Sequence, residues 1–382
     1  MNFLILGNGP EEQQWAQEVN AAERHEVLAV FPSIEGLQTP SQPEDFEAAL
    51  ALAGIEAVIV GGEKEVRTEW LRRVAATGLP AICLHPPGDD SEGYYQVALS
   101  RHETGSVLVP DLPARLHPGL EALRRAIQGE ELGRFRALIQ ESSGWDDLVH
   151  DHFSKRIDVI RALLGEVESL TGLGDPPGPD PDLSLVVQLR GPNARRAEVR
   201  ITSGREEWER LTIQGSEGTL ALEYRPDTFT EARLVRQVEQ QGEVTTDLPA
   251  WSPHQALLSI LDQAIHSHEE GGPHPDLFDG TRAMEVTEAV VRSLRRGRTV
   301  DLHYEVISEA SNFKSVMTSA GCMLLLGILF VLPIALAGPA LGMNWTLYLA
   351  YAILPILILF ALLQFLRFAA NDQPPPPPTD AP

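Results

Sequence analysis

The chain has 382 residues, and 54 acidic against 30 basic side chains give it a formal net charge of -24 at pH 7. This length exceeds one typical hydrophobic core and suits two globular domains with an appendage. Because such a charge repels phosphate backbones and anionic lipid headgroups, we expect no nucleic-acid partner, and any membrane attachment must be hydrophobic.

Short apolar runs alternate with amphipathic segments over the first third of the chain. Strands are expected at residues 3–6, 27–30, 57–60, 81–84 and 107–109. Helices are expected between them, at residues 11–20, 45–53, 66–77 and 92–100. The alternation predicts a parallel sheet with right-handed crossovers, and therefore a Rossmann-like α/β domain over residues 1–119.

The turn after the first expected strand matches part of a phosphate-binding fingerprint. Gly7, Asn8 and Gly9 allow a tight turn and let backbone N–H groups approach a pyrophosphate. The third small position of the G-x-G-x-x-G pattern is Glu12, whose carboxylate competes with a phosphate for the same N–H groups. The second expected strand also ends without the acid that would hold ribose hydroxyls. The motif alone leaves two interpretations open, dinucleotide binding and a nucleotide fold that has lost it.

Residues 120–305 have a different pattern, which predicts a second domain of the α+β class. Strands are expected at residues 136–140, 167–171, 183–189, 197–202, 208–214 and 220–224, and a long helix at 281–294. We expect the strands to form an open antiparallel sheet. One face of this sheet should form the floor of a cleft beside the first domain.

Three segments carry a resemblance to a known family. The turn Gly61-Gly62-Glu63-Lys64 lies between an expected strand and helix, and Leu84-His85-Pro86 follows the next strand. Gly129-Glu130-Glu131-Leu132-Gly133-Arg134-Phe135 leads into the second domain. In this order the segments resemble the glucose–fructose oxidoreductase / inositol dehydrogenase (Gfo/Idh/MocA) family over nearly all of residues 1–303. The resemblance implies an NAD- or NADP-dependent oxidoreductase that acts on a sugar, inositol or related alcohol, and it also implies a homo-oligomer.

The resemblance also implies where the reaction centre lies. The family's cofactor-binding lysine, in a Glu-Lys-Pro tripeptide, corresponds to His85. A later family segment supplies an aspartate and a proton-transferring histidine, and these positions hold Asp151 and Lys155. Histidine and lysine have therefore exchanged places, and a lysine serves as a base only where its surroundings lower its pKa. The implied catalytic residues are Lys155, Asp151 and His85, and the implied cofactor-binding residues are Gly7, Asn8, Gly9, Gly61, Gly62 and His85.

These departures from the family pattern keep a second hypothesis open. It is a catalytically inactive nucleotide- or sugar-binding or scaffold protein with the same fold. His150 and His152, with acids nearby, also suggest a metal site. Their i, i+2 spacing does not bring them to one helix face, so no metal is expected.

The C-terminal part is uncharged from residue 315 to residue 366. It has room for two membrane spans, at residues 317–337 and 345–365, and a turn-rich break separates them. Lys314 and Arg367 flank this hairpin, so we expect both of its ends on the cytoplasmic side. The prediction is a transmembrane hairpin over residues 315–367 with the lipid bilayer as partner, followed by a proline-rich disordered tail over 368–382. The predicted location is the inner (cytoplasmic) membrane, with the globular domains facing the cytoplasm.

Overall fold

A computed structural model describes most of residues 1–302 and six single positions beyond them. The described ranges are 1–129, 131–144, 147–174, 184–204, 208–225, 231–238, 242–267 and 274–302. The single positions are Ile328, Phe330, Val331, Pro333, Ala337 and Tyr351. The chain divides into two compact units, Met1–His303 and Tyr304–Pro382.

The first sheet has five parallel strands in the order β2-β1-β3-β4-β5. The strands are β1 (Asn2–Leu6), β2 (Glu26–Phe31), β3 (Ala57–Val60), β4 (Ala81–Cys83) and β5 (Leu108–Pro110). Their side chains are almost all buried, as expected for a sheet covered on both faces. The predicted Rossmann-like parallel sheet is therefore confirmed.

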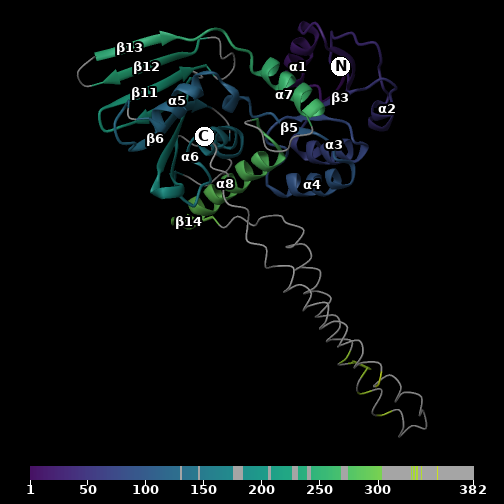
Figure 1. The fold of residues 1–382 in the computed structure, drawn as a ribbon. Coiled ribbons are helices and arrows are strands. Elements are labelled where there is room, and N and C mark those ends of the chain that lie inside the picture. Colours follow the sequence, from purple (N-terminus) through teal and green to yellow (C-terminus); the bar gives the residue numbers. More distant parts are fainter. Residues whose placement is uncertain are drawn as a thin grey trace. The chain divides into compact units, whose positions relative to one another are not determined.

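Helices from two distant parts of the sequence cover this sheet (Figure 1). On one face, α1 (Pro10–Ala21) and α7 (Pro253–Ser267) share a core with β1, in which Trp15 and Leu257 are almost completely buried. On the other face lie α3 (Lys64–Thr77) and α4 (Glu92–Thr104), and the short helix α2 (Phe46–Leu50) packs beside β2. Because α7 comes from beyond residue 250, the second half of the chain completes the packing of the first sheet.

The second sheet has nine strands in the order β13-β12-β11-β10-β6-β9-β8-β7-β14. They are β6 (Ala137–Gly144), β7 (Ser169–Gly174), β8 (Ser184–Arg190), β9 (Arg196–Ser203), β10 (Glu209–Gln214), β11 (Gly218–Tyr224), β12 (Arg233–Val238), β13 (Gly242–Asp247) and β14 (Val300–Asp301). The prediction of an antiparallel sheet was wrong in one respect, because β6 and β9 pair in parallel and make the sheet mixed. Between these two strands the chain passes through a helix and a hairpin, and this connection is long enough to let them run in the same direction.

Five helical segments connect or cover the second sheet. They are η1 (Pro113–Leu116), α5 (Gly119–Gln128), the π-helix η2 (Leu148–Phe153), α6 (Ser154–Leu164) and α8 (Leu277–Arg296), and a short turn η3 (Pro192–Ala194) joins β8 to β9. A buried ion cluster fixes three of them. Arg115 of η1 donates to Asp158 of α6 at 2.7 Å and to Asp279 of α8 at 2.6 Å, and Arg161 of α6 lies 3.3 Å from Asp279. This cluster joins η1, α6 and α8 to one another.

No helix in the described part of the chain is long and apolar enough to cross a membrane. The longest described helix, α8, contains Asp279, Arg282 and Glu285, which the hydrocarbon core of a bilayer would not accommodate. This finding contradicts the predicted localisation in the inner (cytoplasmic) membrane, and that localisation is withdrawn. The predicted hairpin over residues 315–367 and the tail over 368–382 lie outside the described residues, apart from the six single positions.

Candidate functional site

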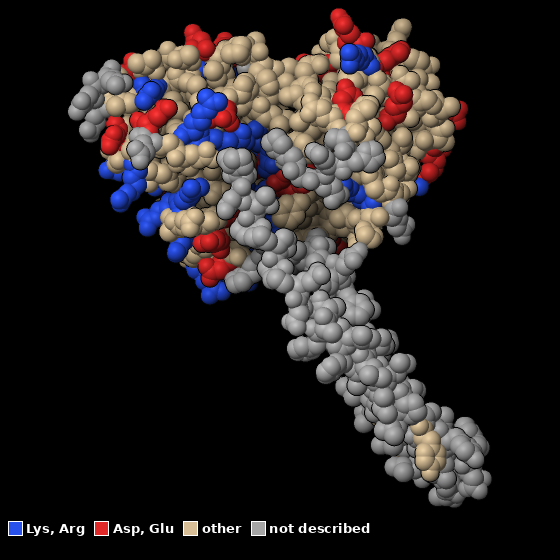
Figure 2. Space-filling model, in the orientation of Figure 1, with Lys and Arg blue, Asp and Glu red and all other residues tan. Residues whose placement is uncertain are grey.

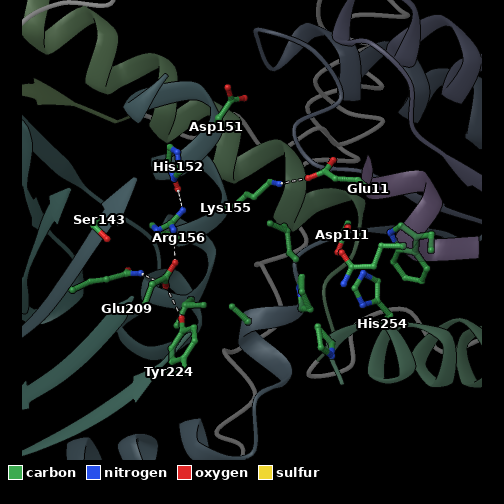
Figure 3. A pocket seen from close by; sticks show the side chains of 18 residues that line it. Glu11, Asp111, Ser143, Asp151, His152, Lys155, Arg156, Glu209, Tyr224 and His254 are labelled. Atoms are coloured by element: carbon green, nitrogen blue, oxygen red, sulfur yellow. Dashed lines mark hydrogen bonds and ion pairs between the residues drawn. The ribbon is translucent and has the colours of Figure 1, made fainter. Parts of the chain in front are cut away.

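A cavity of about 360 Å³ lies between the carboxyl edge of the first sheet and one face of the second (Figure 3). Its walls come from the start of α1, the segment after β5, the helices η2 and α6, strands β6, β10 and β11, and the start of α7. Ligands of open parallel sheets bind outside the carboxyl ends of the strands, which is where this cavity lies. It is therefore the candidate active site.

The floor of the cavity is a buried polar network centred on Glu209 of β10. Arg156 of α6 forms an ion pair with Glu209, and the Tyr224 hydroxyl donates to the same carboxylate at 2.7 Å. The Gln140 amide donates to it as well, at 3.3 Å. Burial raises the pKa of Tyr224 well above its ordinary value, so its hydroxyl stays protonated and remains a donor. The network places one anion and one cation side by side at the bottom of the cavity.

Three polar atoms on this floor are buried without a hydrogen-bond partner in the described structure. They are Gln140 Oε1, Ser143 Oγ and Arg156 Nε. The three side chains are 1%, 5% and 7% exposed. Because native proteins pair nearly all their buried polar groups, a ligand with hydroxyl or carbonyl groups would supply what these atoms lack. No sequence motif marks these residues, because Gln140 and Ser143 lie on strand β6 and Arg156 lies on helix α6.

Two ion pairs link the rim of the cavity to the first sheet's domain. Lys155 Nζ lies 3.1 Å from Glu11 Oε1, and Lys64 at the start of α3 pairs with Asp151. Burial alone would raise the pKa of Glu11, but the positive charge of Lys155 lowers it below the ordinary value of 4.5. Asp151 and Lys155 both line the cavity, and each has a partner of opposite charge.

His85 does not line the cavity. Its side chain is 1% exposed, and Nδ1 lies 2.9 Å from the Tyr94 hydroxyl. Burial, and after it the charge of Lys155, lowers the pKa of His85 to about 3, so the imidazole is neutral. Because this imidazole is neutral and buried, it presents no positive charge to the cavity, although the charge of Lys155 affects its pKa.

Asp111 is a cavity residue that sequence analysis missed. It directly follows β5, so its position at the carboxyl end of a parallel strand was the signal that could have found it. Burial raises the pKa of Asp111, and the charges of Lys155 and His254 oppose this rise. His254, from α7, packs edge-on against Trp15 at 4.6 Å between ring centroids. A carboxyl group of raised pKa facing a lysine is an arrangement that can hold and exchange a proton.

The residues predicted to contact a cofactor lie in the turns that follow β1, β3 and β4. Gly7 and Gly62 have φ angles of 121° and 82°, which favour glycine, and the exposed Asn8 follows Gly7. Arg67 fixes the second turn from beneath by donating to the Gly62 carbonyl at 3.1 Å and to the Pro86 carbonyl at 2.7 Å. Two of these turns therefore have backbone conformations that favour glycine, and Arg67 links the turn after β3 to the turn after β4.

The space between the two glycine turns is filled by the Glu12 side chain, which is 3% exposed. Its Oε1 accepts a hydrogen bond from the Gly62 backbone N–H at 2.6 Å. A Cβ atom added to Gly7, Gly9 or Gly61 would come closer than 3.0 Å to this carboxyl group. The expected competition with phosphate thus involves an N–H of the second turn. We call this space between the two glycine turns the groove, and with Glu12 inside it the groove does not fit a pyrophosphate.

Two further features of the described residues are the charge distribution on their surface and the contact made by His150. On the face shown in Figure 2, basic side chains of the described residues gather over the half that carries the second sheet, with acidic side chains beside them. His150 Nδ1 lies 2.6 Å from Asp147 Oδ2, and the described residues contain no cluster of three or more potential metal ligands.

Comparisons with known proteins identify the fold. No family model matches the chain, and no curated protein matches it. Among solved structures, a myo-inositol dehydrogenase from Corynebacterium glutamicum is 19% identical with a TM-score of 0.64, and the match covers 80% of this chain and 99% of that chain. Levoglucosan dehydrogenase in complex with NADH is 16% identical with a TM-score of 0.68, covering 80% and 100%. An Agrobacterium radiobacter oxidoreductase in complex with NAD+, L-tartaric acid and magnesium is 17% identical with a TM-score of 0.64, covering 79% and 98%. At these identities the similarity establishes a shared two-domain fold.

Proposed function

We propose that the protein is an NAD(P)-dependent oxidoreductase that acts on an alcohol group of a small sugar-like or inositol-like compound. The observation that carries this proposal is the cavity floor, where Gln140 Oε1, Ser143 Oγ and Arg156 Nε are buried without partners. These atoms offer acceptors and donors to several hydroxyl groups at once, and the floor has balanced charge because Arg156 pairs with Glu209. A neutral or singly charged polyhydroxylated compound suits it.

The solved structures of the same fold support this reaction class. Those compared above are oxidoreductases, and two of them hold NAD+ or NADH. Their ligands and names include L-tartaric acid, myo-inositol and levoglucosan, all small molecules rich in hydroxyl groups. A cavity of about 360 Å³ has room for a compound of that size.

Oxidation of an alcohol requires a group that accepts the hydroxyl proton. In our proposal the substrate hydride would pass to the nicotinamide, and Lys155 takes the hydroxyl proton after giving its own proton to the neighbouring carboxylate of Asp111. Asp151 is proposed to position the substrate from the rim. His85 is proposed as a positioning residue beneath Lys155, because it lies outside the cavity.

Titration of the full chain with NADH and with NADPH tests the proposal. Trp15 lines the cavity, so bound nicotinamide should receive energy from tryptophan and its emission should rise to a plateau. If binding is saturable, sugars and inositols are then screened as substrates. Lys155→Ala should abolish turnover of any substrate found, whereas Arg72→Ala, in an exposed pair with Glu69, should leave the rate unchanged. Absence of binding at millimolar cofactor would rule out the oxidoreductase.

A second candidate function is a catalytically inactive sugar-binding or scaffold protein with the same fold. Two observations favour it. The cofactor groove is filled by Glu12, and both charged residues predicted to be catalytic are held in ion pairs. Calorimetric binding of an inositol or sugar without cofactor binding would support this second candidate. A homo-oligomer through the open face of the second sheet stays a prediction.

A further inference from the structure

We propose that the Glu12 carboxylate is a built-in competitor for the phosphate groups of a dinucleotide, and that it sets how tightly the groove binds one. This inference rests on the proposed function, because it takes NAD(P) as the ligand of the groove. It goes beyond that function by assigning the affinity of the groove to one side chain.

The geometry shows how completely Glu12 fills the groove. The side chain leaves the first turn of α1, crosses to the β3–α3 turn and accepts the Gly62 N–H at 2.6 Å. A Cβ added to Gly9 or Gly61 would come closer than 3.0 Å to this carboxyl group, and one added to Gly7 would also meet the Gly62 backbone N. The two glycine turns therefore enclose a carboxylate in the space that Rossmann folds leave for a phosphate.

Charge and donor supply point to the same conclusion. A carboxylate and a phosphate are both anions that seek backbone N–H donors, and they repel each other at short distance. Pro10 at the start of α1 has no N–H, so the helix offers one donor fewer than usual and the Gly62 N–H matters more. A dinucleotide must displace the carboxylate, or bind beside it without this donor.

The test compares cofactor affinity among variants of the full chain. Glu12→Ala removes the carboxyl group and keeps a good helix former. Glu12→Gln keeps its size and an acceptor for Gly62 but removes the charge. Glu23→Gln is the matched control, because it removes one negative charge from an exposed residue beyond the end of α1. Binding of NADH is measured by tryptophan-sensitised fluorescence and by calorimetry, and circular dichroism verifies that each variant is folded.

Removing a hydrogen-bonded charged competitor should tighten NADH binding by about 10- to 100-fold in Glu12→Ala, and by less in Glu12→Gln. Glu23→Gln should bind like the unmodified chain. If the unmodified chain and Glu12→Ala bind NADH with equal affinity, the inference is wrong while the proposed function stands. If Glu12→Ala binds and the unmodified chain does not, the inference holds and the natural chain is no dehydrogenase. If neither binds, the proposed function fails and the inference fails with it.

Discussion

The groove between the two glycine turns and the floor of the neighbouring cavity differ in how their buried polar groups find hydrogen-bond partners. In the groove, the backbone is arranged for a ligand, but the chain satisfies its own donor with Glu12. On the floor, by contrast, buried polar atoms of Gln140, Ser143 and Arg156 lack hydrogen-bond partners among the described residues. A ligand would have to displace a part of the protein in the groove, whereas on the floor it would complete the structure.

This difference shows that a fold and its chemistry are maintained by different residues. Gly9 and Gly61 leave no room for a Cβ beside the Glu12 carboxyl group, whether or not a cofactor binds. The floor network lowers the stability of the fold, because buried ions and polar atoms without hydrogen-bond partners lose the solvation that water would give them. The floor is therefore the better place to test for a bound ligand.

The largest expected effect concerns the floor. Arg156→Met should lower the free energy of unfolding by about 3–5 kcal/mol, because it leaves Glu209 charged and buried without a cation. Urea unfolding followed by tryptophan fluorescence measures the change. As a control, Arg200→Met removes an exposed arginine that pairs with Glu198, and should cost about 1 kcal/mol or less. Equal costs for the two variants would mean that the floor is not the buried network described above.

The next effect concerns the groove. Gly61→Ala places a methyl group against the Glu12 carboxyl and should cost about 1–3 kcal/mol of stability. In a Glu12→Ala background the same change should cost less, with a coupling of about 0.5 kcal/mol or more. Gly191→Ala is the control, since its nearest neighbour would be at an ordinary 3.5 Å. If Gly61→Ala cost the same stability in both backgrounds, the groove would relax freely around Glu12, contrary to its tight packing.

A smaller effect should appear at the helix that carries Asp151. Asp147 accepts from the Val149 and His150 N–H groups at 3.0 and 2.8 Å, so Asp147→Ala should cost about 1 kcal/mol. Burial raises the pKa of Asp147, but the hydrogen bonds from His150 lower it more, to about 2, which is below the ordinary value of 3.8. A depressed carboxyl pKa stabilises the fold above pH 3.8, and this part is lost as the pH falls through about 2.

Unfolding measured against pH checks this cap. The unmodified chain should lose more stability than Asp147→Ala over that acidic window. The same pair raises the pKa of His150, so its contribution is present below the ordinary value of 6.5 and is lost as the pH rises through the raised value. If stability changed with pH in the same way in the unmodified chain and in Asp147→Ala, in both the acidic and the near-neutral range, the Asp147–His150 pair would not be stabilising.

The smallest effect should come from the rim. Lys155 and Glu11 are 41% and 54% exposed, so Lys155→Met should change stability by about 1 kcal/mol or less. The lowered pKa of Glu11 stabilises the fold above its ordinary value of 4.5, and this part is lost as the pH falls through the lowered value. Lys155→Met should weaken that acid-dependent loss, and Glu11→Gln should remove it. A larger stability loss in Lys155→Met than in Arg156→Met would reverse the assignment of rim and floor.

The first sheet was predictable because its strands are continuous apolar runs. Parallel strands covered on both faces need such runs, and Ala57–Val60 is entirely buried. Strand β13 was missed for the opposite reason, since every residue of Gly242–Asp247 is exposed and polarity there resembles a loop. The parallel pairing of β6 with β9 depends on strand order in space, which no local pattern reveals.

The candidate site was predictable only where a motif carried it. Asp151 and Lys155 were implied by the resemblance of one segment to a known family, and both line the cavity. Glu209 and Tyr224 come from strands far along the chain and meet α6 only after the sheet has formed. His85 was expected beside the cofactor, but the sequence does not show that Tyr94 and the surrounding core enclose its ring.

Helix α7 has a consequence for how this protein can be divided. Leu257, Leu258 and Leu261 of this helix pack on the same sheet face as Phe3 and Ile5, at the opposite end of the sequence. A gene truncated after residue 119 would encode a nucleotide-type sheet that keeps α1 but lacks α7 on the same face, and we expect that product to aggregate. Cutting and recombining the two halves, as is done with modular enzymes, would therefore require transplanting α7 together with the amino-terminal piece.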